Sequence, residues 1–134
     1  MATIGVQAMM LKNEFAASGP FETLRQVSGI GYNAVEISQI PMTADNVAEL
    51  RRAKDELGMD IAALSAGLAQ NGRGDSLEGE LDKIVADCGR LGTNLVRIGM
   101  LPFEAMGSLD LVVDFAGRAN DAAKQLAAEG IDLY

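Results

Sequence analysis

The sequence contains no histidine, and this absence excludes a large part of catalytic chemistry. Its 134 residues include 11 Lys and Arg, 19 Asp and Glu, and 0 His. Without an imidazole, neither a Ser-His nor a Cys-His nucleophile pair can form, and no histidine is present to bind a metal. Acid–base chemistry within this chain would therefore depend on carboxylates.

Cysteine and long apolar runs are also scarce. Cys88 is the single cysteine, so no internal disulfide can form, and its place on an apolar helical stripe predicts a buried core thiol. The longest apolar stretches are too short to span a bilayer, and the first residues show neither a charged region nor a cleavage site typical of a signal peptide. We expect a cytoplasmic protein with no membrane partner.

The charge balance narrows the choice of partners. A formal net charge of −8 argues against a general electrostatic attraction to nucleic acid or to an anionic membrane. Small molecules or proteins are therefore the expected partners. The length and the 49% hydrophobic content suit one domain that spans residues 1–134.

A glycine precedes a short apolar run four times along the chain. The runs are GYNAVEIS from Gly31, GMDIAALS from Gly58, GTNLVRIG from Gly92 and GIDLY from Gly130. Apolar residues at helical spacing precede each glycine, which suits the left-handed position just beyond a helix. With ATIGVQAMM as an opening strand, strands and helices alternate. The pattern predicts an α/β fold with a parallel sheet in the order 1-2-3-4 and helices on one face.

Four residues are the expected starts of the helices. Pro20 suits the first helical position, Thr43 and Ser108 are candidate N-caps, and Asp75 begins an acidic variant of the capping box with Glu78. Residues 11–18, 39–42, 67–74 and 101–107 are the expected loops. Their charged and aromatic residues are more typical of solvated or packing positions than of ligand contacts: Lys12, Glu14, Phe15, Arg73, Phe103 and Glu104.

Alignment of the strands on their glycines predicts which side chains share a face. Glu36, Ala63 and Arg97 form one inner row, and Ile61 falls on the same face, whereas Ala62 falls on the helix face. In a barrel, Glu36 and Arg97 would meet inside. A mutually satisfied ion pair and a substrate contact are equally good interpretations of that pair.

Several stretches resemble the N-terminal half of the sugar phosphate isomerase/epimerase family, which has a xylose-isomerase-like TIM barrel. They are IGVQAMMLKNEF, PFETLRQVSGIGYNAVEIS, LRRAKDELGMDIAALSAGL and AAKQLAAEGIDLY. The resemblance implies that the α/β fold is a parallel (β/α)4 half of a TIM barrel plus the start of a fifth strand. It also implies that the chain is an N-terminal fragment of such a barrel.

The resemblance implies aldose–ketose isomerisation or epimerisation of a sugar, sugar phosphate or inositol-type polyol by proton transfer next to a carbonyl. A divalent metal and paired carboxylates would carry the reaction in the full-length family, whose metal ligands come from the fifth strand onward. We therefore expect this chain to bind no metal and to be inactive alone. Glu36 is carried over as a substrate-binding residue, and position on the strands adds Gln7, Ser38, Ser65 and Arg97.

An alternative from a different class is a catalytically empty α/β half-barrel that acts as a binding or assembly module. An unclosed half-barrel exposes strand edges and an inner face. We therefore expect self-association through the open half-barrel.

Overall fold

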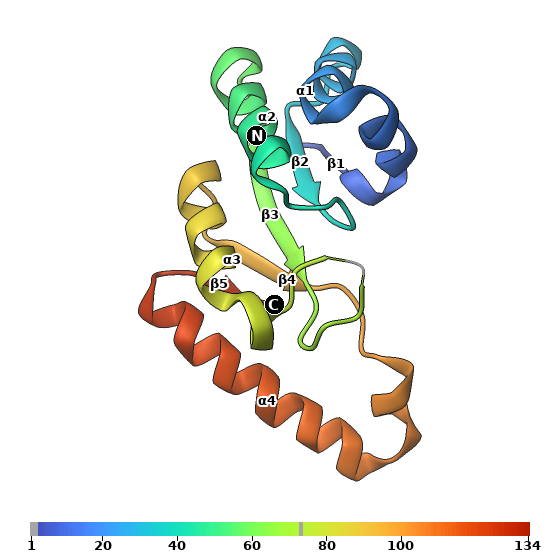
Figure 1. Cartoon of the computed structure of the whole chain (residues 1–134), viewed down its shortest axis with the longest axis vertical. Helices are drawn as coiled ribbons and strands as arrows, with labels where there is room; N and C mark the ends of the chain where they lie inside the picture. The colour runs from blue at the N-terminus through green and yellow to red at the C-terminus, as the bar shows by residue number, and fades with distance from the viewer. Residues whose placement is uncertain (1–2, 73) are drawn as a thin grey trace.

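The computed structural model describes residues 3–72 and 74–134, so Arg73 lies outside the described residues. Strands and helices alternate along the chain as the sequence predicts (Figure 1). The elements are β1 (Gly5–Gln7), η1 (Ala8–Leu11), α1 (Lys12–Ile30), β2 (Ala34–Ile37), α2 (Ala44–Leu57), β3 (Asp60–Ala66), α3 (Leu77–Leu91), β4 (Leu95–Ile98), η2 (Phe103–Gly107), α4 (Leu109–Ala128) and β5 (Asp132–Leu133).

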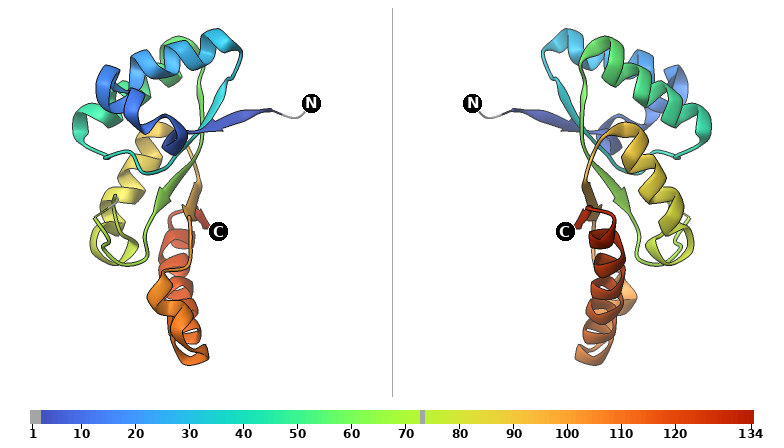
Figure 2. Two further views of the ribbon diagram at one scale, coloured as in Figure 1. Left: turned by 90° about the vertical axis from the view of Figure 1, so that its right-hand side faces the viewer. Right: turned by 90° about the vertical axis from the view of Figure 1, so that its left-hand side faces the viewer.

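The five strands form one open sheet in the order β1-β2-β3-β4-β5. Each neighbouring pair is parallel. Figure 2 shows that α1, α2 and α3 lie on the same side of this sheet. The predicted α/β class, with a parallel sheet of sequential strands, is confirmed, and α1, α2 and α3 lie on one face as predicted. This is the arrangement of consecutive βα units in a barrel, although here β1 and β5 are free edges.

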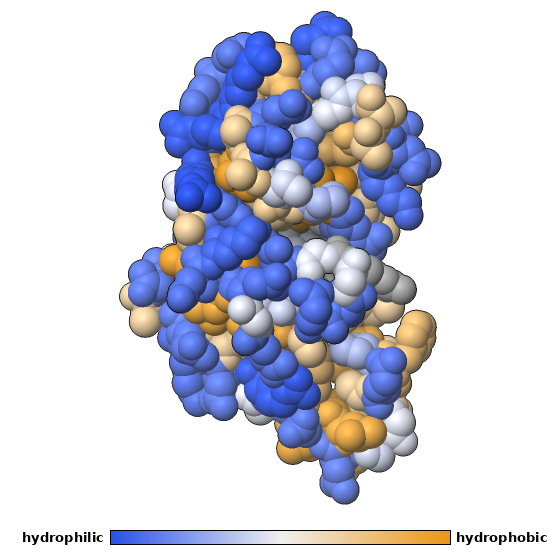
Figure 3. All heavy atoms as spheres, in the orientation of Figure 1, coloured by the Kyte–Doolittle hydropathy of each residue, from blue (hydrophilic) through white to orange (hydrophobic). Residues whose placement is uncertain are grey.

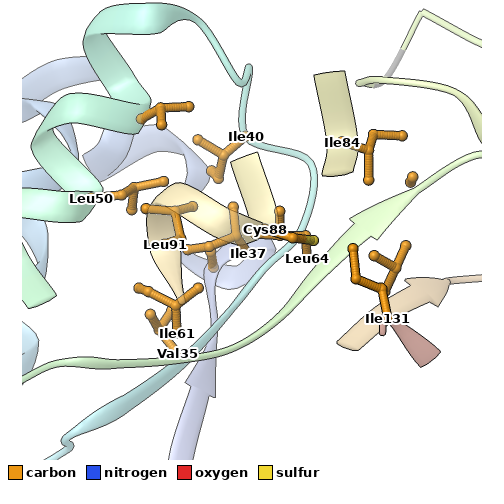
Figure 4. Packing of buried hydrophobic residues seen from close by; sticks show 14 of the residues in the cluster. Val35, Ile37, Ile40, Leu50, Ile61, Leu64, Ile84, Cys88, Leu91 and Ile131 are labelled. Carbon is orange, nitrogen blue, oxygen red and sulfur yellow. The ribbon is translucent and has the colours of Figure 1, made fainter. Parts of the chain in front are cut away.

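The core lies between the sheet and the helices (Figure 4). Val35 and Ile37 of β2 are 0% and 2% exposed, and the helices contribute Leu50 and Leu91, both 0% exposed. Burial of each such side chain stabilises the fold by roughly 1.5–3 kcal/mol. Successive side chains of a strand point to opposite faces, so the residues between these buried ones point away from the helices.

The ends of the helices follow the glycine pattern. Gly31, Gly58, Gly92 and Gly130 have φ angles of 111°, 66°, 68° and 73°. This left-handed conformation suits glycine because any other side chain would be strained there. The prediction from the repeated glycines is confirmed at all four positions.

The N-caps are confirmed at two helices and shifted at a third. Thr43 accepts a hydrogen bond from the Asn46 amide at 3.2 Å, and Ser108 accepts one from Leu111 at 3.3 Å. The cap of α3 is Ser76, not the predicted Asp75.

The reason lies in the partner that completes the cap of α3. A carboxylate oxygen of Glu80 accepts from the backbone amide of Ser76 at 2.7 Å, while the Ser76 hydroxyl accepts from the Gly79 amide at 3.2 Å. Glu78, the predicted partner, instead pairs with Arg118 of α4. The reciprocal cap therefore starts one residue later than the sequence pattern suggested.

The expected loop at residues 11–18 is wrong, because α1 begins at Lys12. Phe15 is 5% exposed, so this added helical segment contributes to the core. At Gly19 the backbone leaves the helix, with φ 79° and ψ 164°, and Pro20 follows as the predicted first residue of the second segment. Glu49 of α2 closes the break, since its Oε2 accepts from the Phe21 amide at 3.0 Å.

The predicted faces of β3 are wrong at its start. Val35 lies opposite Ile61, but the register then shifts and Glu36 lies opposite Ala63. Ala62 is the extra residue of this bulge. Ile61 consequently packs in the core at 1% exposure, and Ala62 is exposed rather than under the helices. From Ala63 onward the predicted alternation holds.

Helix α4 is anchored at one end only. Ala122 and Leu126 in its C-terminal half are 5% and 0% exposed. Arg118 holds Glu78 of α3 with two hydrogen bonds of 2.7 and 2.8 Å. The start of α4 and the preceding η2 project away from the sheet (Figure 1) and carry apolar side chains that colour this end orange in Figure 3. Those exposed by 48% or more are Phe103, Met106, Leu109, Leu111 and Val113, and Met100, just before η2, is 57% exposed.

None of the helices in the described part of the chain is both long and apolar enough to cross a membrane.

Two glycines of α1 should respond in opposite ways to alanine. At Gly19 an added Cβ would lie 2.6 Å from Glu49 Oε2 on a backbone with positive φ, so Gly19→Ala should destabilise the fold by about 2 kcal/mol. At Gly29 nothing lies within 4 Å of an added Cβ, so Gly29→Ala should stabilise by about 0.5–1 kcal/mol. Urea unfolding measures both, and a Gly19→Ala variant as stable as the parent would contradict the role given to the break.

Candidate functional site

Four polar side chains from four adjacent strands meet on the face opposite the helices. Oε1 of Glu36 accepts hydrogen bonds from Gln7 Nε2 and from Ser65 Oγ, each at 3.0 Å. Nη1 of Arg97 donates to the same oxygen and forms a salt bridge with it. Gln7, Glu36, Ser65 and Arg97, here called the Glu36 cluster, are four of the five substrate-binding residues predicted from the sequence.

Strand register brings the side chains of the Glu36 cluster together near the ends of four neighbouring strands. Gln7 is the last residue of β1, and the other three are the next-to-last residues of their strands. Gln7 lies directly opposite Glu36, and Ser65 lies opposite Arg97. The cluster therefore sits at the carboxyl ends of the strands, which is where parallel sheets bind their ligands.

The predicted row that placed Arg97 opposite Ala63 is wrong in register. Arg97 pairs with Ser65, two residues farther along β3 than Ala63. An alignment on the glycines is correct only if pairing begins the same number of residues after each glycine. Parallel strands that form a barrel are staggered, and the stagger accumulates across the sheet. Two residues is an even step, so Arg97 keeps the predicted face and still reaches Glu36.

The two oxygens of the Glu36 carboxylate differ in their hydrogen bonds. Across residues 3–72 and 74–134, all three hydrogen bonds to this side chain end on Oε1, and Oε2 has no hydrogen-bond partner. The Glu36 and Arg97 side chains are 22% and 24% exposed, so solvent reaches both. The pair is formally neutral. Arg97 also directs Nη2 toward the carbonyl of Gly99 at 3.4 Å.

Ser38, the fifth predicted residue, is not part of the Glu36 cluster. It follows β2 and is 6% exposed, and its hydroxyl makes no hydrogen bond to the cluster within the described residues. The next residue, Gln39, was missed by sequence reasoning. It has φ 56°, which is uncommon for a residue other than glycine, and its amide lies 3.8 Å from the Met9 sulfur. No sequence signal marks that conformation.

The loop residues considered as ligands do not join the cluster. Lys12 and Glu14 lie exposed on the first segment of α1, and Phe103 and Glu104 lie exposed in η2. Phe15 packs into the core instead. The candidates for substrate contact are thus the residues on the strands, as position in the predicted sheet suggested.

The described residues do not fit the divalent metal that the family resemblance implies. Among them there is no group of three or more His, Cys, Asp or Glu side chains that could hold a metal ion. Glu36 is the carboxylate of the cluster, and the positive charge of Arg97 beside it opposes a cation. No step of a metal-dependent reaction is therefore assigned to these strands.

A second charged group lies on α3 and is structural. Asp87 is 2% exposed and is held by Lys83 at 2.9 Å and by Arg90 at 3.1 Å. Cys88 beside it is 1% exposed, which confirms the predicted core thiol. Burial, with a smaller contribution from the negative charge of Asp87, raises the pKa of Cys88 to about 11. The thiol therefore stays protonated at neutral pH and is a poor nucleophile.

A scan against protein-family models finds no matching family, and a search of curated proteins finds no match either. The fold and the site define a class: a parallel α/β protein of alternating strands and helices, with a polar cluster at the carboxyl edge of its open sheet. The likeness to sugar phosphate isomerases rests on the sequence motifs quoted above.

The Glu36–Arg97 pair should show energetic coupling. Glu36→Gln and Arg97→Met should each destabilise the fold by about 1–2 kcal/mol, because the first removes the charge that faces Arg97 and the second removes a charged donor to Oε1. The double variant should lose about 1 kcal/mol less than the sum. Urea unfolding of the four proteins measures this. Arg25 pairs with Glu22 on the surface, so Glu36→Gln combined with Arg25→Met is the control and should be additive; equal coupling in both cycles would contradict the assignment.

Cys88 should resist thiol reagents in the folded protein. At pH 8 an unfolded cysteine is partly ionised, whereas a thiol with a pKa of about 11 is almost wholly protonated and is also inaccessible. Ellman's reagent should label the folded chain only as fast as it opens, and should label it at once in 6 M guanidinium chloride, a standard unfolding condition. Prompt labelling without denaturant would show that α3 does not bury this side chain.

Proposed function

We propose that the chain forms the N-terminal half of a TIM barrel of the sugar phosphate isomerase/epimerase type, and that its Glu36 cluster binds the substrate. The substrate class is a sugar, sugar phosphate or inositol-type polyol. One observation carries the proposal: four polar side chains from β1, β2, β3 and β4 converge at the carboxyl ends of the strands, on the face that a barrel would enclose. A purely structural sheet face would more readily be apolar.

The cluster supplies recognition rather than a complete reaction. Proton transfer next to a carbonyl needs a positioned base on each side of the reacting carbons. The Glu36 cluster holds one carboxylate, and that carboxylate is paired with Arg97. In this proposal, the second base and the divalent metal with its ligands come from further βα units. The coding sequence beyond Tyr134 tests this directly, because an in-frame continuation with histidine and paired acidic residues supports a complete barrel enzyme.

The 134-residue chain alone should therefore show no metal-dependent activity. Titration calorimetry with manganese should show no micromolar binding, because Glu36 brings a single carboxylate and Arg97 repels a cation. A ketose-to-aldose assay on the same chain should show no turnover. Micromolar manganese binding, or turnover that Glu36→Gln abolishes, would contradict this expectation, and Glu104→Gln in the exposed η2 is the matched control.

A second candidate function is an assembly module, and two observations favour it. The sheet leaves β1 and β5 as unpaired edges. The start of α4 and η2 also expose five large apolar side chains, which is the kind of surface that partners cover. In this hypothesis the half-barrel catalyses no reaction and packs against another protein or a second copy of the chain.

Both candidates lead us to expect self-association of the isolated chain. Light scattering from micromolar to hundreds of micromolar concentration should show a rising average mass, because the open edges and apolar residues gain by pairing. Leu109→Lys and Val113→Lys on the exposed side of α4 should reduce the association, and Lys124→Arg in the anchored half should leave it unchanged. A constant monomeric mass over this range would exclude the expectation.

A further inference from the structure

We propose that the Glu36 cluster recognises a neutral vicinal diol, meaning two hydroxyl groups on adjacent carbons, and that it does not bind a phosphate. This inference rests on the proposed function and narrows its substrate: a sugar or polyol would meet these strands through its hydroxyl groups, and any phosphate would be bound elsewhere.

The first argument is the unequal use of the two carboxylate oxygens of Glu36. A carboxylate offers about four acceptor positions, roughly two on each oxygen. Here Oε1 receives Gln7, Ser65 and Arg97, whereas Oε2 has no hydrogen-bond partner among the described residues. No side-chain oxygen or nitrogen among the described residues is both buried and without a hydrogen-bond partner, and the Glu36 side chain is 22% exposed, so Oε2 faces solvent. An O–H donor of a ligand can therefore replace water at Oε2.

The second argument is the spare donor capacity of Arg97. A guanidinium carries five N–H groups, and those of Arg97 that bond within the described chain reach Glu36 Oε1 and the Gly99 carbonyl. Arg97 therefore keeps N–H groups for a ligand, on the side chain that is already paired with Glu36. A single hydroxyl can donate to Oε2 and accept from Arg97, but it brings only one oxygen to the two groups. Two adjacent hydroxyls gain more, because one donates to Oε2 while its neighbour accepts from Arg97, and each keeps further hydrogen-bonding capacity.

Charge selects against ionic ligands. Glu36 and Arg97 together are formally neutral. A phosphate drawn to Arg97 would lie against the negative Oε2, and an ammonium drawn to Oε2 would lie against the guanidinium. A neutral group that both donates and accepts meets no such repulsion. A diol fits this pattern, whereas a phosphate ester would need further cations that the cluster does not supply.

The bonds to Oε1 hold the carboxylate in place for this task. Gln7 and Ser65 approach Glu36 from the strands on either side, each at 3.0 Å. Held from both sides and by Arg97, the carboxylate has little freedom to rotate, and binding costs less when the acceptor is already oriented. Removal of Ser65 Oγ should therefore weaken diol binding less than loss of the Glu36 charge.

The test is a titration of the whole chain followed in ¹H–¹⁵N spectra, with the side-chain signals of Gln7 and Arg97 as reporters. The probes are cis-1,2-cyclohexanediol, 1,4-cyclohexanediol and inorganic phosphate. The first two have the same ring and the same number of hydroxyls and differ only in adjacency. We expect saturable millimolar shifts with the 1,2-diol, and affinity about tenfold weaker or undetectable with the 1,4-diol, because only one hydroxyl can then reach the cluster.

Glu36→Gln replaces the charged acceptor with an amide of the same shape and should weaken 1,2-diol binding about tenfold. Ser65→Ala should weaken it less, and Glu104→Gln in the exposed η2 should leave it unchanged. The backbone spectrum of each variant shows whether it is folded. Comparison of the three probes on the parent chain needs no variant, so the inference stays testable if Glu36→Gln does not fold.

Equal affinity for the two diols, displacement of the 1,2-diol by phosphate, or no shift with any probe would overturn the inference. Binding is measured without turnover, so its outcome is separate from that of the proposed isomerase. If the 1,2-diol binds but a completed barrel is inactive, diol recognition by the Glu36 cluster is supported and the proposed isomerase function is contradicted. If a completed barrel isomerises a sugar phosphate while phosphate displaces the diol from this chain, the isomerase function is supported and recognition of a neutral diol is contradicted.

Discussion

A single oxygen atom, Oε1 of Glu36, organises the face of the sheet that no helix covers. On the helix side, packing of Val35, Ile37 and their neighbours fixes the strands. On the other face, polar contacts hold the strands in position, because Gln7, Ser65 and Arg97 each donate a hydrogen bond to the same carboxylate oxygen. The bulge at Ala62 and the stagger of β4 set the positions from which these side chains reach it. The register of β1 to β4 and the polar cluster therefore depend on each other.

Local signals explain what the sequence could predict. Gly31, Gly58, Gly92 and Gly130 each require a left-handed backbone for reasons within one turn of helix, so the alternation of helices and strands was correct. The inward side chains of the Glu36 cluster were identified because alternation along a strand survives even-numbered shifts of register.

Features that depend on distant residues were not predictable in the same way. The helical segment before Gly19 depends on the burial of Phe15, and the face of Ile61 depends on a bulge that only pairing with β2 creates. The same holds for Ser76, whose cap uses Glu80 from a break inside α3 rather than the regularly spaced Glu78. Gln39 has a positive φ that its own sequence does not require. In each case tertiary contact decides between local alternatives.

The carboxylate of Glu49 makes α1 and α2 a cooperative unit. It belongs to α2, yet it satisfies a backbone amide at the start of the second segment of α1, and Arg52 of α2 stacks over the Phe21 ring at 3.7 Å. Neither helix can open locally without exposing groups of the other, so their amides should exchange with solvent in one event. The projecting start of α4 has no such dependence, and it can fray while the sheet stays intact.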